Sequence, residues 1–193
     1  MNTLFNNSDR TAYLETKQFE NIALLEKCVQ EIENNLIERP EITVCGKKCH
    51  QRRNVGFFSN ESVGYKYSRQ MMNSKQLTGP LLELLYSVNA SIGTRFNGIL
   101  VNYYKNGEDY IGAHSDNEAG LDKYGVISLS YGASRKFRVR DKATKKILFD
   151  TKLNQGEMMH MGGNFQKLYT HEIPVEKKVK DGRYSFTFRK HMT

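Results

Sequence analysis

Two segments of the chain carry hydrophobic residues at helical spacing. Within residues 16–36 the apolar positions recur at three- and four-residue steps from Phe19 to Leu36, which predicts an amphipathic helix. A second helix is predicted over residues 80–90, because Pro80 suits a helix start and the following leucines form one face. Both apolar stripes are most simply explained as faces that pack against a core.

After residue 95 the pattern changes to short runs rich in β-branched and aromatic residues. Gly, Asn and Asp punctuate these runs, as is typical of strands joined by tight turns. Seven strands are therefore predicted, over residues 96–104, 125–131, 136–140, 146–150, 157–161, 170–175 and 183–189. Strands at this spacing predict a mainly β (α+β) fold, namely a sandwich, a barrel or a jelly roll, with the helices packed outside the sheets.

The charge of the chain is distributed unevenly. The 193 residues carry a formal net charge of +8 and a pI of about 9.3, yet residues 9–41 hold eight acidic and four basic residues. The remainder is therefore strongly basic, which favours a polyanionic partner, most often nucleic acid. A basic surface that serves solubility alone would give the same composition.

The length and the cysteine content suit one intracellular domain. Three irregularly spaced cysteines argue against a disulfide framework. No apolar run approaches the ~20 residues that span a membrane, and the first residues, MNTLFNNSDR, lack the apolar segment of a signal peptide. We expect a monomer with no membrane partner, in the nucleus or cytoplasm (of a host cell if the gene is viral).

The segment YIGAHSDNEAG, residues 110–120, contains the first candidate for chemistry. His114 and Asp116 lie two residues apart, so on a strand their side chains would point to the same side. His171, on a different predicted strand, is the best remaining candidate for a third ligand. Two histidines and one carboxylate form the facial triad of non-haem Fe(II) oxygenases, although a His-x-Asp pair also recurs by chance.

The last predicted strand, RYSFTFR (183–189), has an aromatic face and a polar face. The polar face carries Arg183, Ser185, Thr187 and Arg189, and the Cα atoms of the two arginines would lie roughly 20 Å apart on an extended strand. Two guanidinium groups that lean inward could hold the two ends of a short dicarboxylate. Beside an iron triad such a ligand points to 2-oxoglutarate, while the alternative is an ordinary solvated strand face.

The strand FNGILVNYY adds a further pair of hydrogen-bonding side chains. Asn102 and Tyr104 share one strand face, and both an amide and a phenol can donate to a carboxylate. Taken alone, the pair fits equally a strand-end asparagine and a core tyrosine.

Together these motifs resemble the AlkB family of Fe(II)/2-oxoglutarate dioxygenases, most closely its nucleic-acid demethylases of the eukaryotic DNA-repair type. The matching motifs are FN-x3-VNYY, KNGEDYIGAHSDNE, ISLSYGASRKF, LYTHEIP and RYSFTFR, and upstream of them GKKCHQRRNVGFF and GYKYS. The resemblance covers roughly residues 44–190. It implies a double-stranded β-helix (jelly-roll) fold in one domain, residues 1–193, with a helical part (1–43), a nucleotide-recognition region (44–95) and a catalytic core (96–190).

The resemblance also implies roles for the candidate residues. By position His114, Asp116 and His171 would bind Fe(II). The co-substrate 2-oxoglutarate would be held by residues on two strands, with Arg189 near its chelating carboxylate: Asn102, Tyr104, Arg183, Ser185, Thr187 and Arg189. The AlkB pattern often has Asn or Asp at the position of Ser185, so the second anchor of that carboxylate is a departure from the pattern.

The same resemblance implies contacts with the substrate. Glu118 would face the exocyclic amine of a flipped base, and Tyr67, with Tyr65 nearby, would stack on it. Two basic groups are expected along the nucleic-acid backbone. In the region that the resemblance assigns to substrate recognition they are Lys47, Lys48, Arg52, Arg53, Lys66 and Arg69. In the basic stretch 135–146 they are Arg135 and Arg138, although a solvated hairpin explains that stretch as well. Phe57 or Phe58 could act as a wedge in duplex DNA, although a core role explains them as well.

The expected reaction is oxidative demethylation of N-alkylated bases such as N1-methyladenine and N3-methylcytosine. It would consume O2 and 2-oxoglutarate at Fe(II) and release formaldehyde, succinate and CO2, in DNA and, as a further candidate, in RNA. Two alternatives stay open: an oxygenase of the same chemistry acting on protein or another substrate, and a nucleic-acid binding module without catalysis.

Overall fold

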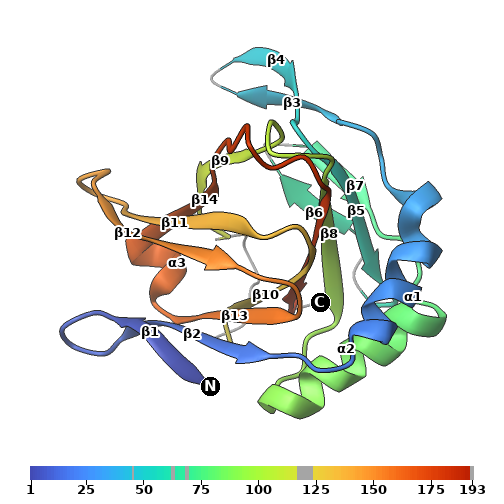
Figure 1. The fold of residues 1–193 in the computed structure, drawn as a ribbon, viewed down its shortest axis with the longest axis horizontal. Coiled ribbons are helices and arrows are strands. Elements are labelled where there is room, and N and C mark those ends of the chain that lie inside the picture. Colours follow the sequence, from blue (N-terminus) through green and yellow to red (C-terminus); the bar gives the residue numbers. More distant parts are fainter. Residues whose placement is uncertain (45, 62–63, 68–69, 117–123, 192–193) are drawn as a thin grey trace.

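The computed structural model describes residues 1–193 except 45, 62–63, 68–69, 117–123 and 192–193, and it leaves out the side chains of residues 44, 65–67 and 70–71. Two β-sheets face each other across a core, and two helices cover the outer face of the larger sheet (Figure 1). The jelly-roll architecture predicted from the sequence is therefore confirmed.

The larger sheet has seven strands and joins the N-terminal segment to the C-terminal one. Its order is β1 (Asn2–Asn6), β2 (Ala12–Gln18), β13 (Glu157–Gly163), β10 (Val126–Gly132), β15 (Arg183–Arg189), β8 (Gly98–Tyr104) and β5 (Asn54–Ser59). All neighbouring pairs are antiparallel. Directly opposed residues of such pairs share a face, so the register decides which side chains meet in the core.

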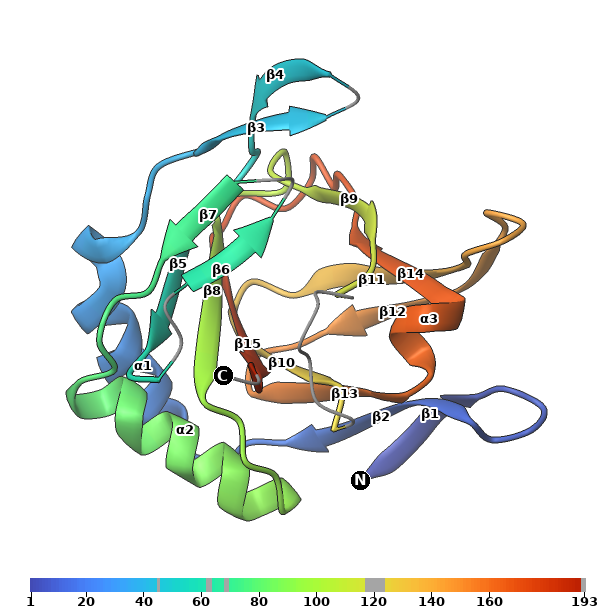
Figure 2. The ribbon, with the colours of Figure 1, turned by 180° about the vertical axis from the view of Figure 1, so that it is seen from behind.

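The smaller sheet has four strands and closes the other side of the core. Its order is β12 (Ile147–Leu153), β11 (Arg135–Asp141), β14 (Tyr169–Ile173) and β9 (Ile111–His114). Two further hairpins, seen from behind in Figure 2, lie outside the main sheets: β3 (Glu41–Val44) with β4 (Lys47–His50), and β6 (Gly64–Tyr67) with β7 (Gln70–Asn73). A short helix, α3 (Phe165–Leu168), connects β13 to β14.

Helices α1 (Ile22–Ile32) and α2 (Gly79–Ile92) pack on the outer face of the larger sheet, as Figure 1 shows. Their buried residues, such as Leu25 and Leu84, meet sheet residues such as Ile127 and Phe186 in one cluster. Asn21 caps α1 by accepting a hydrogen bond from the backbone N–H of Leu24 (3.1 Å). These contacts confirm that the helices lie outside the sheet core.

The first predicted helix begins later than expected. Residues 16–18, placed in that helix from the sequence, belong instead to β2, which runs along the larger sheet, and a 3-10 turn (Glu33–Asn35) replaces the last helical turn. In β2 the residues at Ala12, Leu14 and Thr16 are buried while those between are not, so the two-residue period outweighs the helical one. The segment 1–43 is consequently part strand and part helix.

The remaining expectations agree more closely with the structure. The second helix and all seven predicted strands are present, with ends that differ by a few residues. Among the described residues no helix is both long and apolar enough to cross a membrane.

Candidate active site

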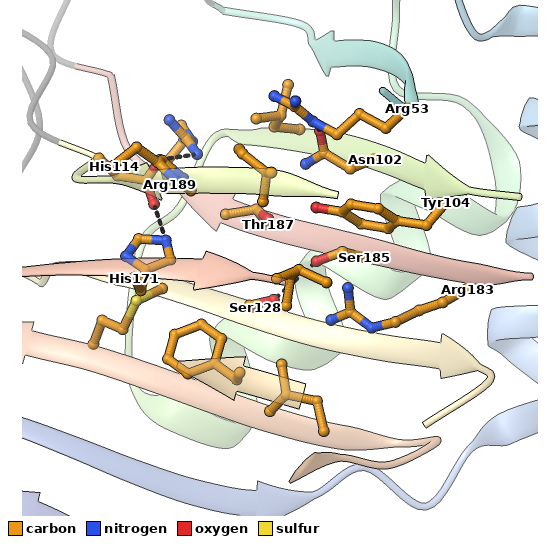
Figure 3. Close-up of a pocket in the computed structure, with 17 residues that line it drawn as sticks. Arg53, Asn102, Tyr104, His114, Ser128, His171, Arg183, Ser185, Thr187 and Arg189 are labelled. Atoms are coloured by element: carbon orange, nitrogen blue, oxygen red, sulfur yellow. Dashed lines mark hydrogen bonds and ion pairs between the residues drawn. The ribbon is translucent and has the colours of Figure 1, made fainter. Parts of the chain in front are cut away.

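A cavity lined by both polar and apolar side chains lies between the two sheets. Figure 3 shows side chains from both sheets converging on it. All the residues predicted to bind the metal or the co-substrate line it: Asn102, Tyr104, His114, Asp116, His171, Arg183, Ser185, Thr187 and Arg189.

Three potential metal ligands meet at one end of this cavity. His114 ends β9 and pairs directly with His171 on β14, while Asp116 lies just beyond the end of β9. One ligand atom from each residue can be chosen so that all lie within 4.8 Å of one another, and Nε2 of His171 is 3.5 Å from Oδ2 of Asp116. The expectation that His114 and Asp116 share a strand face is thus corrected in detail, because the strand ends at His114 and Asp116 lies beyond it.

One hydrogen bond orients the ring of His114, and another holds the backbone at Asp116. Nδ1 of His114 lies 2.9 Å from the carbonyl oxygen of Gly112, which can only accept, so Nδ1 carries the proton and Nε2 keeps its lone pair. The backbone N–H of Asp116 donates to Oε1 of Gln166 (2.9 Å). Two imidazoles and a carboxylate fit the donor set of a non-haem Fe(II) site.

The local electrostatics keep the ligands deprotonated. Burial lowers the pKa of His171 to about 3, with a further contribution from His114, and burial also lowers the pKa of His114. Burial alone would raise the pKa of Asp116, but Arg189 and the two imidazoles outweigh it and lower this pKa to about 2. Nη2 of Arg189 donates to Oδ1 of Asp116 at 3.2 Å. A cation therefore meets three groups with available lone pairs.

The other end of the cavity offers hydrogen-bond donors in place of lone pairs. Arg183 is buried and pairs in register with Tyr104, and its Nη2 donates to Oγ of Ser130 (2.8 Å). Among the described residues, Nε and Nη1 of Arg183 are buried without a hydrogen-bond partner. Burial lowers the pKa of this guanidinium to about 10, so it stays charged at neutral pH. A carboxylate is the group that such unused charged donors fit.

Further side chains connect the two ends. Ser185 pairs in register with Asn102, Thr187 pairs with Leu100, and Oγ of Ser185 lies 2.9 Å from Oγ of Ser128. Ser128 was not selected from the sequence, although the alternation in ISLSY could have indicated that it points inward.

Arg53 lies in a different place from the one that the sequence predicted. It was expected on the nucleic-acid backbone, but it is 5% exposed, lines the cavity and donates from Nε to Oδ1 of Asn102 at 2.7 Å (Figure 3). This bond turns the amide Nδ2 of Asn102 away from Arg53. The side chain is therefore part of the cavity wall and not of the surface.

Two other basic residues are also engaged within the protein. Arg135 is 1% exposed and its guanidinium is surrounded by protein acceptors. Arg138 is held by Asp150 through two nitrogens (2.7 and 2.9 Å) and lies 3.4 Å from Glu172. Burial in one case and ion pairing in the other argue against the expected phosphate contacts.

The two candidate wedge residues are buried. Phe57 stacks on the ring of His191 with centroids 5.2 Å apart, and Phe58 belongs to the core beneath the helices. The structure thus favours the core role that the sequence left open.

The remaining substrate candidates divide into two groups. Lys47, Lys48 and Arg52 are exposed on or beside the β3–β4 hairpin. The others lie outside the described residues or have undescribed side chains, and their roles stay predictions: Tyr65, Lys66, Tyr67, Arg69 and Glu118.

A two-histidine, one-carboxylate cluster in a jelly-roll cavity that also holds a buried guanidinium with two unused nitrogens is typical of non-haem Fe(II) oxygenases. The sequence model of the 2OG-Fe(II) oxygenase superfamily matches residues 12–189, which is most of the chain. The protein belongs to this superfamily, whose metal is iron and whose co-substrate is 2-oxoglutarate.

Individual relatives agree with the AlkB resemblance. Human DNA oxidative demethylase ALKBH2 is 30% identical over 157 residues, 77% of this chain and 60% of that protein. Human alpha-ketoglutarate-dependent dioxygenase alkB homolog 3 is 33% identical over 135 residues, 65% of this chain and 47% of that protein. The chain thus spans about half of the length of these curated relatives.

A solved structure of OsALKBH1 has the same fold. It superposes with a TM-score of 0.59 at 14% identity and covers 92% of this chain and 97% of its own. At this level of identity the likeness supports the jelly roll and nothing about the substrate.

Proposed function

We propose that the protein oxidatively demethylates N-alkylated bases in DNA, with RNA as a second nucleic-acid substrate, and so reverses alkylation damage directly. The observation that carries the proposal is the cavity with a metal cluster at one end and a buried, partly unpaired Arg183 at the other. The similarity to ALKBH2 and alkB homolog 3 supports a methylated base as the substrate.

The residues of the chain would divide the work between binding and orientation. His114, Asp116 and His171 would hold Fe(II), which in this family supplies the activation of O2. Arg183 would receive the distal carboxylate of 2-oxoglutarate with its unused N–H groups.

The overall change follows from the atoms that enter and leave. One oxygen atom of O2 enters the methyl group, and the resulting hydroxymethyl group leaves nitrogen as formaldehyde. The other oxygen atom enters 2-oxoglutarate, which loses CO2 and becomes succinate. The base must leave the stack to reach the buried cluster, and a methylated base that cannot pair does so at lower cost.

Exposed basic residues would hold the strand during this step. Lys47, Lys48 and Arg52 lie on or next to the hairpin that projects from the body beside β9, as both ribbon views show (Figures 1 and 2). Contacts to phosphates position a strand without selecting its sequence. Tyr67 and Glu118 are the proposed contacts to the base itself.

Turnover on defined oligonucleotides tests the proposal. The protein with Fe(II), 2-oxoglutarate and ascorbate is given single- and double-stranded DNA and RNA, each with one N1-methyladenine or N3-methylcytosine. We expect formaldehyde and repaired base in equal amounts, and neither product from His114→Ala. Failure to repair any methylated strand would overturn the proposal.

The same experiment separates the alternatives. Consumption of 2-oxoglutarate without base repair would indicate an oxygenase for another substrate. Nucleic-acid binding without consumption of 2-oxoglutarate would indicate a binding module.

A further inference from the structure

Arg135 is a buried arginine whose hydrogen bonds connect separate parts of the chain. Its Nε lies 3.2 Å from Oε2 of Glu176, and its Nη1 donates to the carbonyl of Asn106 (3.0 Å). Its Nη2 donates to the carbonyls of Asp109 and Pro174, both at 2.8 Å. A guanidinium with this many protein acceptors is fixed in place and is shielded from any phosphate.

The acceptors belong to two loops, or lie at their ends, and each loop joins one strand of the smaller sheet to one strand of the larger sheet. Residues 105–110 join β8, which carries Asn102 and Tyr104, to β9, which carries His114. Residues 174–182 join β14, which carries His171, to β15, which begins at Arg183. Each connection therefore links a strand with a metal-ligand candidate to a strand with a candidate for the distal carboxylate, and Arg135 bonds to both.

The two connections also contact each other directly. The N–H of Gly107 donates to the carbonyl of Val179 (2.9 Å), and the N–H of Glu176 donates to the carbonyl of Gly107 (2.7 Å). A Cβ atom at position 107 would collide with the backbone of Glu176. The close crossing at this glycine leaves the two connections little freedom to shift apart while Arg135 holds them.

Arg135 reaches the cavity wall through Tyr104. Its guanidinium carbon lies 5.7 Å from the centroid of the Tyr104 ring, and that of Arg183 lies 5.5 Å from the same centroid. Cations within about 6 Å of an aromatic ring stabilise its position. The ring that borders the proposed carboxylate site is thus held by one arginine that faces the cavity and one that does not line it.

We propose that Arg135 is a positioning residue that sets the spacing between the metal end and the carboxylate end of the cavity. The inference rests on the proposed co-substrate site and adds to it a residue that touches neither ligand. A ligand that uses both ends, such as 2-oxoglutarate, should depend on Arg135. A ligand that chelates the metal alone, such as oxalate, should not.

Calorimetric titration of the full chain tests this dependence. Mn(II) replaces iron, and 2-oxoglutarate and oxalate are titrated in turn into the wild type, Arg135→Met and Arg135→Lys. Replacing a residue that orients a binding group without touching the ligand typically lowers affinity roughly 10- to 100-fold. We therefore expect Arg135→Met to weaken 2-oxoglutarate binding by about that factor. Oxalate and Mn(II) affinities should stay close to those of the wild type, and Arg135→Lys should recover part of the loss.

Two controls separate positioning from general destabilisation. Arg140→Met changes an arginine on the same strand that pairs outward with Glu172 (2.9 Å), and it should leave 2-oxoglutarate binding within about twofold of the wild type. Leu85→Ala removes core packing beneath the helices. It should lower the melting temperature without separating the two ligand affinities.

The outcomes distinguish this inference from the function on which it rests. If the wild type with Mn(II) does not bind 2-oxoglutarate, the proposed co-substrate site is wrong and the inference falls with it. If the wild type binds but Arg135→Met keeps its affinity, or loses 2-oxoglutarate and oxalate alike, only the inference is overturned. Should Arg135→Met not fold, Arg135→Lys and Glu176→Ala decide, and unchanged 2-oxoglutarate affinity in both would overturn it.

Discussion

The two ends of the cavity differ in the kind of ligand that they can bind. At the metal end, two imidazoles and a carboxylate bring lone pairs together, and Arg189 balances the charge of Asp116. At the opposite end Arg183 carries a buried positive charge whose Nε and Nη1 have no partner in the described part of the chain. One end fits a cation and the other an anion.

This difference explains why one small molecule would bridge them. A dicarboxylate that chelates a metal with one end can place its second carboxylate against Arg183, which satisfies both ends with a single ligand. Buried groups that are unsatisfied in the free protein cost stability, and proteins keep them where a ligand completes them. The contrast therefore predicts that changes at the two ends separate metal binding from co-substrate binding.

The largest effect is expected for Asp116→Asn. The carboxylate stays charged at neutral pH because its pKa is lowered to about 2, and the amide removes that charge at the same shape. Replacing a residue that only hydrogen-bonds to a metal ligand typically lowers metal affinity roughly 10- to 100-fold. Losing the charge of the ligand itself should therefore weaken Mn(II) binding by more than roughly 100-fold. Calorimetry or the EPR signal of free Mn(II) measures the change.

A matched control makes this result specific. Asp150→Asn applies the same substitution to a carboxylate that pairs with Arg138 on the outer side of the smaller sheet. It should leave Mn(II) binding unchanged. Equal Mn(II) affinity in Asp116→Asn and the wild type would remove Asp116 from the metal site.

A smaller and selective effect is expected for Arg183→Met. Since a hydrogen bond to a charged group contributes about 1.5–3 kcal/mol, the KM for 2-oxoglutarate should rise roughly 10- to 100-fold. Mn(II) affinity should stay unchanged, because Arg183 lies at the other end of the cavity. Steady-state kinetics and metal titration together give the separation.

The stability of the ligand-free protein provides a second measurement on the same variant. A buried charge with unused donors is unfavourable, and its replacement by an apolar chain of similar length is often neutral or stabilising. The melting temperature of Arg183→Met without ligand should therefore equal or exceed that of the wild type. A lower melting temperature with unchanged KM would show that Arg183 has a structural role.

The same contrast shows how much of the site the sequence could predict. The alternation in RYSFTFR placed Arg183 and Arg189 on one face, and both line the cavity as that pattern requires. For the metal cluster, the two-residue spacing paired His114 with Asp116, and His171 was added as the best remaining histidine and by its motif position, since no local period relates it to the pair. Side-chain alternation and motif order were thus sufficient to predict the residues at both ends of the cavity.

The burial of Arg135 and Arg53 could not be predicted from charge. Both were assigned to the surface by charge, but burial depends on whether partners exist inside, and those partners lie far along the chain. For Arg135 a signal was available, because it alternates in phase with Phe137 and Val139, which are buried. For Arg53 the partner is Asn102, and nothing local indicates that contact.

The smallest effect is expected midway between the two ends, at Ser185. Its hydroxyl lies 2.9 Å from that of Ser128, so a neutral hydrogen bond is already made inside the protein. Since such a bond is worth about 1 kcal/mol, Ser185→Ala should raise the KM for 2-oxoglutarate only about fivefold. Ser128→Ala should give a similar change if the two hydroxyls act together. A loss as large as that of Arg183→Met would mean that Ser185 anchors a carboxylate itself, and the division of the cavity into two separate ends would no longer hold.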